Sequence, residues 1–182
     1  MIERKKQKAV FLDRDGTLIE EVNFLHRLED LRYFTFTDEA VRRLKEKGFL
    51  VIVVTNQSGI ARGKYTVEDM HRIHERIQAD LTEKLDAFYF CPHLPDAGCR
   101  CRKPRLGMIE FALNDFPIDL KDSWMIGDKI LDIELGLNAG LKTALVRTGY
   151  GENHRHELPR RPDLIVENLL AAVEQIVGSS DL

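Results

Sequence analysis

Short runs of apolar residues recur along this sequence and alternate with stretches that have helical periodicity. The runs that predict strands are Ala9–Leu12, Phe49–Thr55, Ala87–Phe90, Trp124–Gly127, Thr143–Val146 and Leu164–Val166. Unbroken apolar runs suit strands that are buried on both faces of a parallel sheet. The alternation of such strands with helices predicts an α/β fold, in which helices cover both faces of a parallel sheet.

Helical patterns fill most of the stretches between these runs. Thr37 or Asp38 is a good cap for a first helix, which we expect to end at Gly48. Later helices are predicted to begin near Gly107 and to cover Ile130–Ala139 and Leu169–Val177. The stretch Ile19–Phe36 is mixed and aromatic without a sustained period, and we interpret it as a flap over the end of the first strand.

The longest helix is predicted to begin after Thr66, which is a good capping residue. The apolar positions along one face of this helix are Val67, Met70, Ile73, Ile77, Leu81 and Leu85. His71 and His74 on the same helix are expected to be solvated rather than to bind a ligand. The basic run from His154 to Arg161 is expected to be an exposed loop.

Composition narrows the class of protein. With 182 residues, 43% of them hydrophobic and 31% charged, the chain is expected to form a single soluble domain over residues 1–182. The net charge of −3 gives no basic surface for nucleic acid or a membrane. No apolar run approaches the length of a transmembrane helix. The three cysteines cluster between residues 91 and 101, which favours a metal site in a reducing cytoplasm over a disulfide framework.

Two carboxylates follow the first predicted strand. Asp13 and Asp15 come directly after Ala9–Leu12, and Gly16 follows them. Ligands of parallel α/β sheets bind beyond the carboxyl ends of the strands, so both acids are expected in a cleft. Two acids at one strand end can hold a hard cation and still leave one oxygen free to attack. The alternative is an ordinary surface turn, since Asp-Gly is a common turn dipeptide.

Polar groups with complementary chemistry follow the later strands. Thr55 can donate its hydroxyl to a phosphoryl oxygen, and the Gly-bearing turn after it offers backbone N–H groups. Lys103 could neutralise a phosphoryl group and keep Asp13 ionised. Asp128 could complete a Mg²⁺ site with Asp13 and the backbone carbonyl of Asp15. Each of these signals alone is compatible with a turn or a solvated charge.

Taken together, these segments resemble the four motifs of the haloacid dehalogenase superfamily. The run Asp13-Arg14-Asp15-Gly16-Thr17 is similar to its first motif, and the ends of the later strands match the others in order. The resemblance implies a Rossmann-like sheet and an Mg²⁺-dependent phosphatase. In that reading Asp13 is the nucleophile that forms an aspartyl-phosphate, and Asp15 is the general acid and base. Asp132 would orient the site.

The cysteine-rich segment has the composition of a closed zinc site. Cys91, His93, Cys99 and Cys101 supply three thiolates and one imidazole, which together complete a tetrahedral shell. Such a shell leaves no open position for catalysis, so a structural Zn²⁺ is predicted. Unliganded free cysteines are the alternative.

The zinc loop that leads into Cys101-Arg102-Lys103-Pro104 resembles one branch of the superfamily. This branch contains D-glycero-D-manno-heptose 1,7-bisphosphate phosphatases and histidinol-phosphate phosphatase domains, which lack a large cap domain. The run Thr55–Gly63 resembles the heptose enzymes, which remove the 7-phosphate from a precursor of lipopolysaccharide or glycoprotein heptoses. The short zinc loop would also suit the histidinol group. A broad sugar phosphatase and a non-enzymatic phosphate-binding module are further alternatives.

The resemblance to the heptose enzymes also implies a set of substrate contacts. In the flap and after the second strand these are Glu21, Val22, Asn23, Phe24, Thr55, Asn56, Gln57 and Ser58. Arg102 would recognise the second phosphate, and Lys103 and Lys129 would also meet the substrate. A cytoplasmic monomer acting on a small sugar phosphate is expected.

Overall fold

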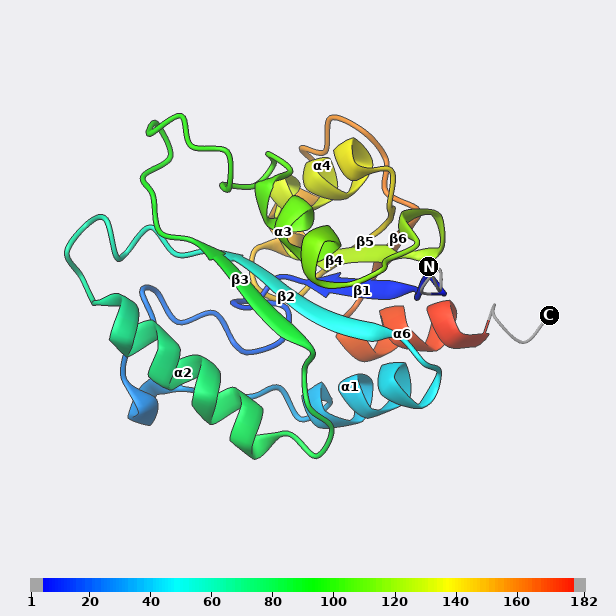
Figure 1. Cartoon of the computed structure of the whole chain (residues 1–182), viewed down its shortest axis with the longest axis horizontal. Coiled ribbons are helices and arrows are strands. Elements are labelled where there is room, and N and C mark those ends of the chain that lie inside the picture. Colours follow the sequence, from blue (N-terminus) through cyan, green and yellow to red (C-terminus); the bar gives the residue numbers. More distant parts are fainter. Residues whose placement is uncertain (1–4, 179–182) are drawn as a thin grey trace.

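A computed structural model describes residues 5–178, in which helices pack on both faces of one parallel sheet (Figure 1). The strands are β1 (Ala9–Leu12), β2 (Leu50–Asn56), β3 (Ala87–Cys91), β4 (Trp124–Gly127), β5 (Lys142–Val146) and β6 (Leu164–Val166). The helices are α1 (Thr37–Glu46), α2 (Val67–Asp80), α3 (Gly107–Asp115), α4 (Ile130–Ala139), α5 (Gly151–His154) and α6 (Leu169–Gly178), and two 3-10 turns are η1 (Leu28–Asp30) and η2 (Leu120–Asp122). The predicted fold class is confirmed.

The order of the strands places β1 near the middle of the sheet. The order is β3-β2-β1-β4-β5-β6, and every neighbouring pair is parallel. Phe11 in β1 lies beside Ile52 of β2 on one side and Met125 of β4 on the other. The chain therefore builds outward from β1 in both directions. In such sheets the crevice for a ligand lies at the carboxyl ends of the strands from which the chain continues in opposite directions along the sheet.

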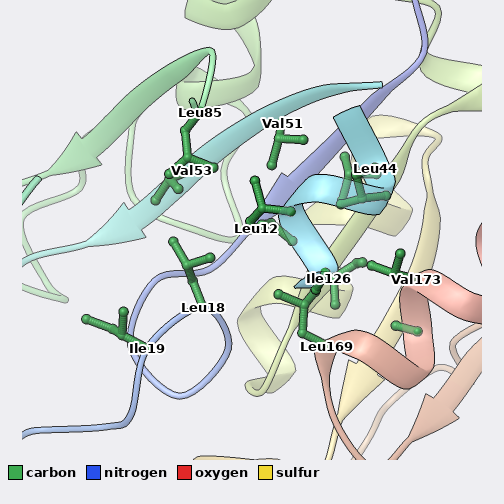
Figure 2. Close-up of a cluster of buried hydrophobic side chains, with 14 of the residues drawn as sticks. Leu12, Leu18, Ile19, Leu44, Val51, Val53, Leu85, Ile126, Leu169 and Val173 are labelled. Carbon is green, nitrogen blue, oxygen red and sulfur yellow. The ribbon is translucent and has the colours of Figure 1, made fainter. Parts of the chain in front are cut away.

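Successive side chains of the central strands point to opposite faces and bury two separate cores. Leu12, Val53 and Ile126 belong to the core on the side of α1, α2 and α6 (Figure 2). Phe11 and Ile52 belong to the core on the side of α3 and α4. Because both faces are covered, the strands read as continuous apolar runs rather than as alternating ones.

The end of α2 differs from the prediction. The helix ends at Asp80, so Leu81 and Leu85 are not on it, although both are buried. The Gln78 side chain accepts a hydrogen bond from the Leu85 backbone N–H and donates one to the Leu85 carbonyl. This pair of bonds folds the chain back under the helix, so the apolar face continues after the helix has stopped.

The structure corrects the prediction for one of two helical histidines and shifts one end of the predicted basic loop. His71 is exposed as expected, but His74 is buried with only 5% of its surface exposed, so its predicted solvation is wrong. The short helix α5 reaches His154, the first residue of the predicted loop, and the rest of that run is irregular.

The flap between β1 and α1 is anchored to the body of the protein. Ile19 forms a β-bridge to Tyr33 in antiparallel orientation, and Leu18 and Leu25 are buried. Within residues 5–178, loops rather than a separate cap domain cover the strand ends. Over the same residues, every helix is too short or too polar to cross a bilayer.

Gly136→Ala should destabilise the protein because α4 lies very close to the sheet at this position. A Cβ atom at residue 136 would come within 2.5 Å of Thr143 Cγ2 and 2.8 Å of Met125 Cβ. Overpacking of this kind costs about 1–3 kcal/mol, which outweighs the helix propensity gained. Thermal unfolding should show a lower Tm. The matched control is Gly178→Ala at the exposed end of α6, where the added methyl group meets no atom and should not lower Tm.

Candidate active site

The site begins where β1 ends. Asp13 continues the strand by donating its N–H to the Ile126 carbonyl of β4 at 3.0 Å. Gly16 then turns the chain with φ of +86°, a conformation that favours glycine. Asp13 and Asp15 are 3% and 9% exposed. Both carboxylates are therefore held by the strand and the turn at the carboxyl edge of the sheet, as predicted.

Two ammonium groups, those of Lys103 and Lys129, flank the carboxylate of Asp13. Lys103 Nζ lies 2.8 Å from Asp13 Oδ1, and Lys129 Nζ lies 3.4 Å from Asp13 Oδ2. Lys103 also contacts Asp132 Oδ1 at 2.6 Å and donates a hydrogen bond to the Val54 carbonyl at 2.9 Å. The lysine predicted from the third motif thus reaches the nucleophile candidate from the loop after β3.

These contacts decide the charge of Asp13. Burial alone would raise the pKa of this carboxyl, but Lys103 and Lys129 hold it well below its ordinary value. Burial acts to lower the pKa values of both lysines, and the neighbouring carboxylates, Asp13 foremost, raise them instead. Asp13 is therefore ionised although it is buried.

Asp128 at the end of β4 brings a further carboxylate to the same place. Carboxylate oxygens of Asp13, Asp128 and Asp132 all lie within 4.8 Å of one another. Burial first, and then Asp13, raise the pKa of Asp128 to about 8. Its Oδ2 accepts a hydrogen bond from the Tyr150 N–H at 2.9 Å, whereas Oδ1 finds no hydrogen-bond donor within residues 5–178. A buried carboxylate oxygen without a donor at this position is suited to a cation.

The groups around Asp128 bring oxygen ligands close together. A Cβ atom on Gly16 or Gly149 would come within 2.3 Å or 2.2 Å of Asp128 Oδ2, so the backbone closes tightly on this carboxylate. The Asp15 carbonyl faces the same point, since Lys129 Nζ lies 3.4 Å from it and 3.6 Å from Asp128 Oδ1. Oxygen ligands of this kind are the ones that Mg²⁺ prefers. The residues present therefore fit that ion.

Asp132 lies where an orienting residue is expected. Its Oδ1 contacts Lys103 Nζ, and its Oδ2 accepts a hydrogen bond from the Lys129 N–H at 3.0 Å. Asp132 thus links the side chain of one lysine to the backbone of the other. Burial raises the pKa of this carboxyl, and the lysines oppose that rise.

Asp15 is held by a different network from that of Asp13. Arg14 donates to both carboxylate oxygens of Asp15, from Nε at 3.1 Å and from Nη2 at 3.0 Å. Gln57 Nε2 donates to Asp15 Oδ2 at 2.9 Å and to Thr55 Oγ1 at 2.8 Å. Tyr65 in turn donates to Gln57 Oε1. The sequence predicts no role for Arg14, although it lies within the first motif, or for Tyr65, because a polar residue that contacts another polar residue leaves no local pattern.

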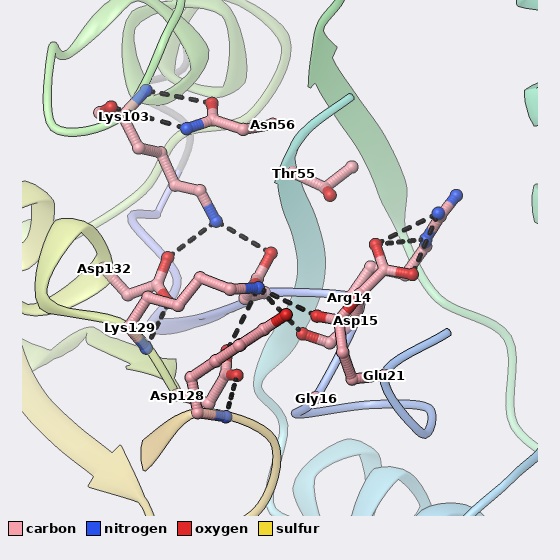
Figure 3. A network of polar contacts seen from close by, with 12 residues as sticks. Arg14, Asp15, Gly16, Glu21, Thr55, Asn56, Lys103, Asp128, Lys129 and Asp132 are labelled. Atoms are coloured by element: carbon pink, nitrogen blue, oxygen red, sulfur yellow. Dashed lines mark hydrogen bonds and ion pairs between the residues drawn. The ribbon is translucent and has the colours of Figure 1, made fainter. Parts of the chain in front are cut away.

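Asn56 also supports another residue of the site. Its Oδ1 accepts the N–H of Lys103 at 3.1 Å, and its Nδ2 donates to the Lys103 carbonyl at 3.4 Å. This pair of bonds fixes the backbone of Lys103 across the end of β2 (Figure 3).

A cavity of about 110 Å³ opens beside Asp15. Its lining includes predicted contacts from the flap, from the end of β2 and from the start of α4, namely Glu21, Val22, Asn23, Phe24, Asn56, Gln57, Ser58 and Lys129. Lys129 Nζ lies 3.2 Å from Glu21 Oε2. Arg102 lines a neighbouring cavity with Cys99 instead.

The four predicted zinc ligands come together in the loop after β3. The ligand atoms of Cys91, His93, Cys99 and Cys101 all lie within 4.8 Å of one another. His93 Nδ1 lies 3.5 Å from Cys91 Sγ and 3.3 Å from Cys101 Sγ, and Cys91 Sγ lies 3.5 Å from Cys99 Sγ. The cysteines are not joined by disulfides. Zn–S bonds of about 2.3 Å would place the sulfur atoms roughly this far apart, so the cluster fits tetrahedral zinc.

Comparison with known proteins identifies the family to which the chain is similar. A profile described as polynucleotide kinase 3 phosphatase matches residues 8–134, and one described as HAD-hydrolase-like matches residues 100–172. A D-glycero-D-manno-heptose-1,7-bisphosphate 7-phosphatase from Thermosynechococcus vestitus is 43% identical, with 92% of this chain and 94% of the relative covered. A D-glycero-β-D-manno-heptose-1,7-bisphosphate 7-phosphatase from Haemophilus ducreyi is 38% identical over 93% of this chain and 98% of that protein.

A solved structure is similar over nearly the whole chain. It is the D,D-heptose 1,7-bisphosphate phosphatase from B. bronchiseptica in complex with magnesium and phosphate, and it superposes with a TM-score of 0.88 at 30% identity. The match covers 95% of this chain and 99% of that one.

Asp128→Asn should raise Tm in Mg²⁺-free buffer at neutral pH. The pKa of Asp128 is raised from 3.8 to about 8, so the folded protein binds a proton that the unfolded chain releases. This stabilisation is complete below pH 3.8 and is lost as pH rises through about 8, whereas asparagine has no proton to lose. The Tm difference between variant and wild type should therefore widen from pH 5 to pH 8, by about 2–4 °C per kcal/mol.

Scanning fluorimetry of desalted protein at several pH values measures this difference. Asp122→Asn, on the exposed turn before β4, is the matched control and should follow the wild type. Equal Tm values for Asp128→Asn and wild type at pH 8 would contradict the prediction.

Proposed function

The chain belongs to the HAD-like phosphatases, in the family of the D-glycero-D-manno-heptose-1,7-bisphosphate 7-phosphatases, and we propose that it removes the 7-phosphate of this sugar bisphosphate. As a member of this family it is a phosphoric monoester hydrolase. The proposal rests on the ionisation of Asp13. This buried carboxylate is kept ionised by two ammonium groups, beside a polar cavity.

Asp13 has the role of the nucleophile in this proposal. One of its oxygens attacks phosphorus and forms an aspartyl-phosphate, while the bond from phosphorus to the sugar oxygen breaks. Asp15 donates a proton to the departing oxygen. Lys103 and Lys129 offset the repulsion between a carboxylate and a phosphate dianion, which amounts to several kcal/mol for each pair of unit charges at about 4 Å.

The second half of the reaction returns the enzyme to its starting state. Asp15 accepts a proton from a water molecule whose oxygen attacks the phosphorus of the aspartyl-phosphate. The bond between Asp13 and phosphorus breaks, and inorganic phosphate leaves. Thr55 is placed to bind a phosphoryl oxygen together with the backbone N–H groups that follow β2.

Mg²⁺ would be held by Asp13, Asp128 and the carbonyl of Asp15. When bound, this ion neutralises charge on the phosphoryl oxygens and orients the group for in-line attack. Zn²⁺ would be held by the Cys₃His cluster, and its role is structural because four protein ligands leave no open position.

Substrate recognition is assigned to the cavity beside Asp15. Glu21 and the three residues after it, together with Ser58, would contact the sugar, and Lys129 would meet both sugar and phosphate. Arg102 lines the cavity beside Cys99, where it would bind the second phosphate. We expect residues 1–182 to act as a one-domain monomer. A cytoplasmic location is expected because reduced cysteines are needed to hold zinc.

A substrate panel tests this function. In the presence of Mg²⁺, kcat/KM for heptose 1,7-bisphosphate should exceed that for histidinol phosphate and for fructose bisphosphate by well over tenfold, with both anomers of the heptose measured. The physical reason is that a cavity of about 110 Å³ lined by polar groups matches hydroxyls better than an imidazole ring. A preference for histidinol phosphate would reverse the assignment.

The control for this panel is Asp13→Asn, which keeps the shape of the side chain. An amide neither attacks phosphorus nor carries the charge that the lysines stabilise, so phosphate release should be abolished while circular dichroism shows a folded protein. Activity near that of the wild type would exclude the covalent mechanism.

Cys99→Ser should lose zinc and most of the activity without removing a catalytic group. Cys101 is separated from Lys103 by Arg102 alone, so a loosened cluster also releases the lysine that contacts Asp13. A displacement of about 1 Å can cost about 10²-fold in rate. Elemental analysis should give about one zinc per wild-type chain, and added Mg²⁺ should not rescue the variant.

The matched control is Ala97→Ser in the same exposed loop, which should keep both zinc and activity. Fully active wild-type protein that contains no zinc would contradict the coupling but not the phosphatase assignment.

A further inference from the structure

His74 lies in the buried interior, behind the catalytic edge rather than in the cavity. It is on α2, its ring stacks on Phe88 of β3 with centroids 4.4 Å apart, and 5% of its surface is exposed. Its Nε2 lies 3.2 Å from Nη1 of Arg14. A histidine in this position contacts neither the candidate metal ligands nor the zinc cluster, and the reaction described above does not use it.

The direction of this hydrogen bond follows from the chemistry of the two groups. A guanidinium only donates, so Nε2 of His74 must accept and the ring proton must be on Nδ1. Burial, reinforced by the charge of Arg14, lowers the pKa of His74 to about 2, so the ring is neutral at physiological pH. His74 is thus a permanent hydrogen-bond acceptor in the protein interior.

Arg14 transmits this contact to Asp15. Its side chain is 1% exposed, and its N–H groups are divided among Asp15, Gln57 and His74. Because the guanidinium is planar and rigid, fixing Nη1 fixes the direction of the two bonds to the Asp15 carboxylate. Without the acceptor on His74, one end of the guanidinium would have a buried donor that lacks a partner, and it would rotate to find one.

We propose that His74 is a positioning residue for the phosphatase reaction, which acts through Arg14 to hold the Asp15 carboxylate in the orientation needed for proton transfer. The proposal rests on the proposed function, because it takes Asp15 as the general acid and base. The essential property of residue 74 is a buried acceptor at the place of Nε2, and an imidazole as such is not required.

Three variants separate this role from simple packing. His74→Leu keeps an apolar side chain of similar size without an acceptor, and His74→Gln restores an acceptor oxygen near the place of Nε2. His71→Leu, one turn earlier on the exposed face of α2, is the matched control. With heptose bisphosphate, kcat of His74→Leu should fall between about tenfold and 10²-fold with little change in KM. His74→Gln should recover most of this loss, and His71→Leu should match the wild type.

A burst measurement gives the readout that a structural role would not move. p-Nitrophenolate leaves without a proton, so with p-nitrophenyl phosphate the first step needs no general acid, while hydrolysis of the aspartyl-phosphate still needs Asp15 as base. His74→Leu should release about one p-nitrophenolate per chain rapidly and then turn over slowly. Asp15→Asn, with a loss of about 10²–10⁴ in rate, should show the same pattern more strongly.

The results that would overturn the inference are distinct from those that would overturn the function. A His74→Leu variant with wild-type kcat would exclude the positioning role. A fall in rate explained entirely by a smaller burst, that is, by fewer active chains, would exclude it as well. Equal rates for His74→Leu and His74→Gln would also exclude it. Failure of the wild-type protein to release phosphate, or full activity of Asp13→Asn, would instead exclude the proposed function.

Discussion

Like charges brought together at one edge of a buried sheet are the constraint on which this structure depends. Asp13 and Asp128 end neighbouring strands, and Asp132 follows within one turn of helix. At about 4 Å and an effective dielectric of 20, each pair of carboxylates would repel by roughly 4 kcal/mol if both were ionised, and the raised pKa of Asp128 relieves part of this repulsion. Lys103 and Lys129 offset this repulsion. Both lysines reach the carboxylates because the loops after β3 and β4 return to the same edge of the sheet.

Contacts from several separate parts of the chain hold these two lysines in place. Asn56 binds the backbone of Lys103 from the end of β2, and the Cys₃His cluster closes the loop immediately before it. Asp132 joins the side chain of Lys103 to the N–H of Lys129. Breaking one member of a buried ion pair typically costs about 3–5 kcal/mol, because the partner charge is left uncompensated. The zinc loop and the capping of α4 therefore stabilise the same set of charges.

The main parts of this site could be predicted from the sequence because they follow strands that are recognisable as apolar runs. Strand ends in a parallel sheet share one edge, so Asp13, Thr55 and Asp128 could be placed together without knowing any distance. The short spacing of Cys91, His93, Cys99 and Cys101 likewise indicated that their side chains could meet around one metal ion. Which side chains contact one another within the site could not be predicted, because these contacts depend on the directions in which the side chains point in three dimensions.

Residues 56, 57 and 74 illustrate that limit. Asn56 and Gln57 were expected to contact substrate, and although both line the cavity, their amide groups bind Lys103, Asp15, Thr55 and other protein groups. His74 has a helical position like that of its exposed neighbour His71, and only its partner, 60 residues earlier in the chain, distinguishes it. A polar residue that supports another polar residue leaves no periodic or local signal in a sequence.

The difference between the two acids of the first motif follows from the same geometry. Asp13 and Asp15 are identical side chains two positions apart, but Asp13 faces two ammonium groups whereas Asp15 faces a guanidinium and an amide. Strong charge neutralisation suits a carboxylate that must stay ionised and attack. A hydrogen-bonded and oriented carboxylate suits proton transfer, so environment rather than residue type assigns the two roles. Arg14 between them points away from the lysines (Figure 3) and contacts His74 of α2. The residue that separates the acids in sequence therefore also separates their surroundings in space.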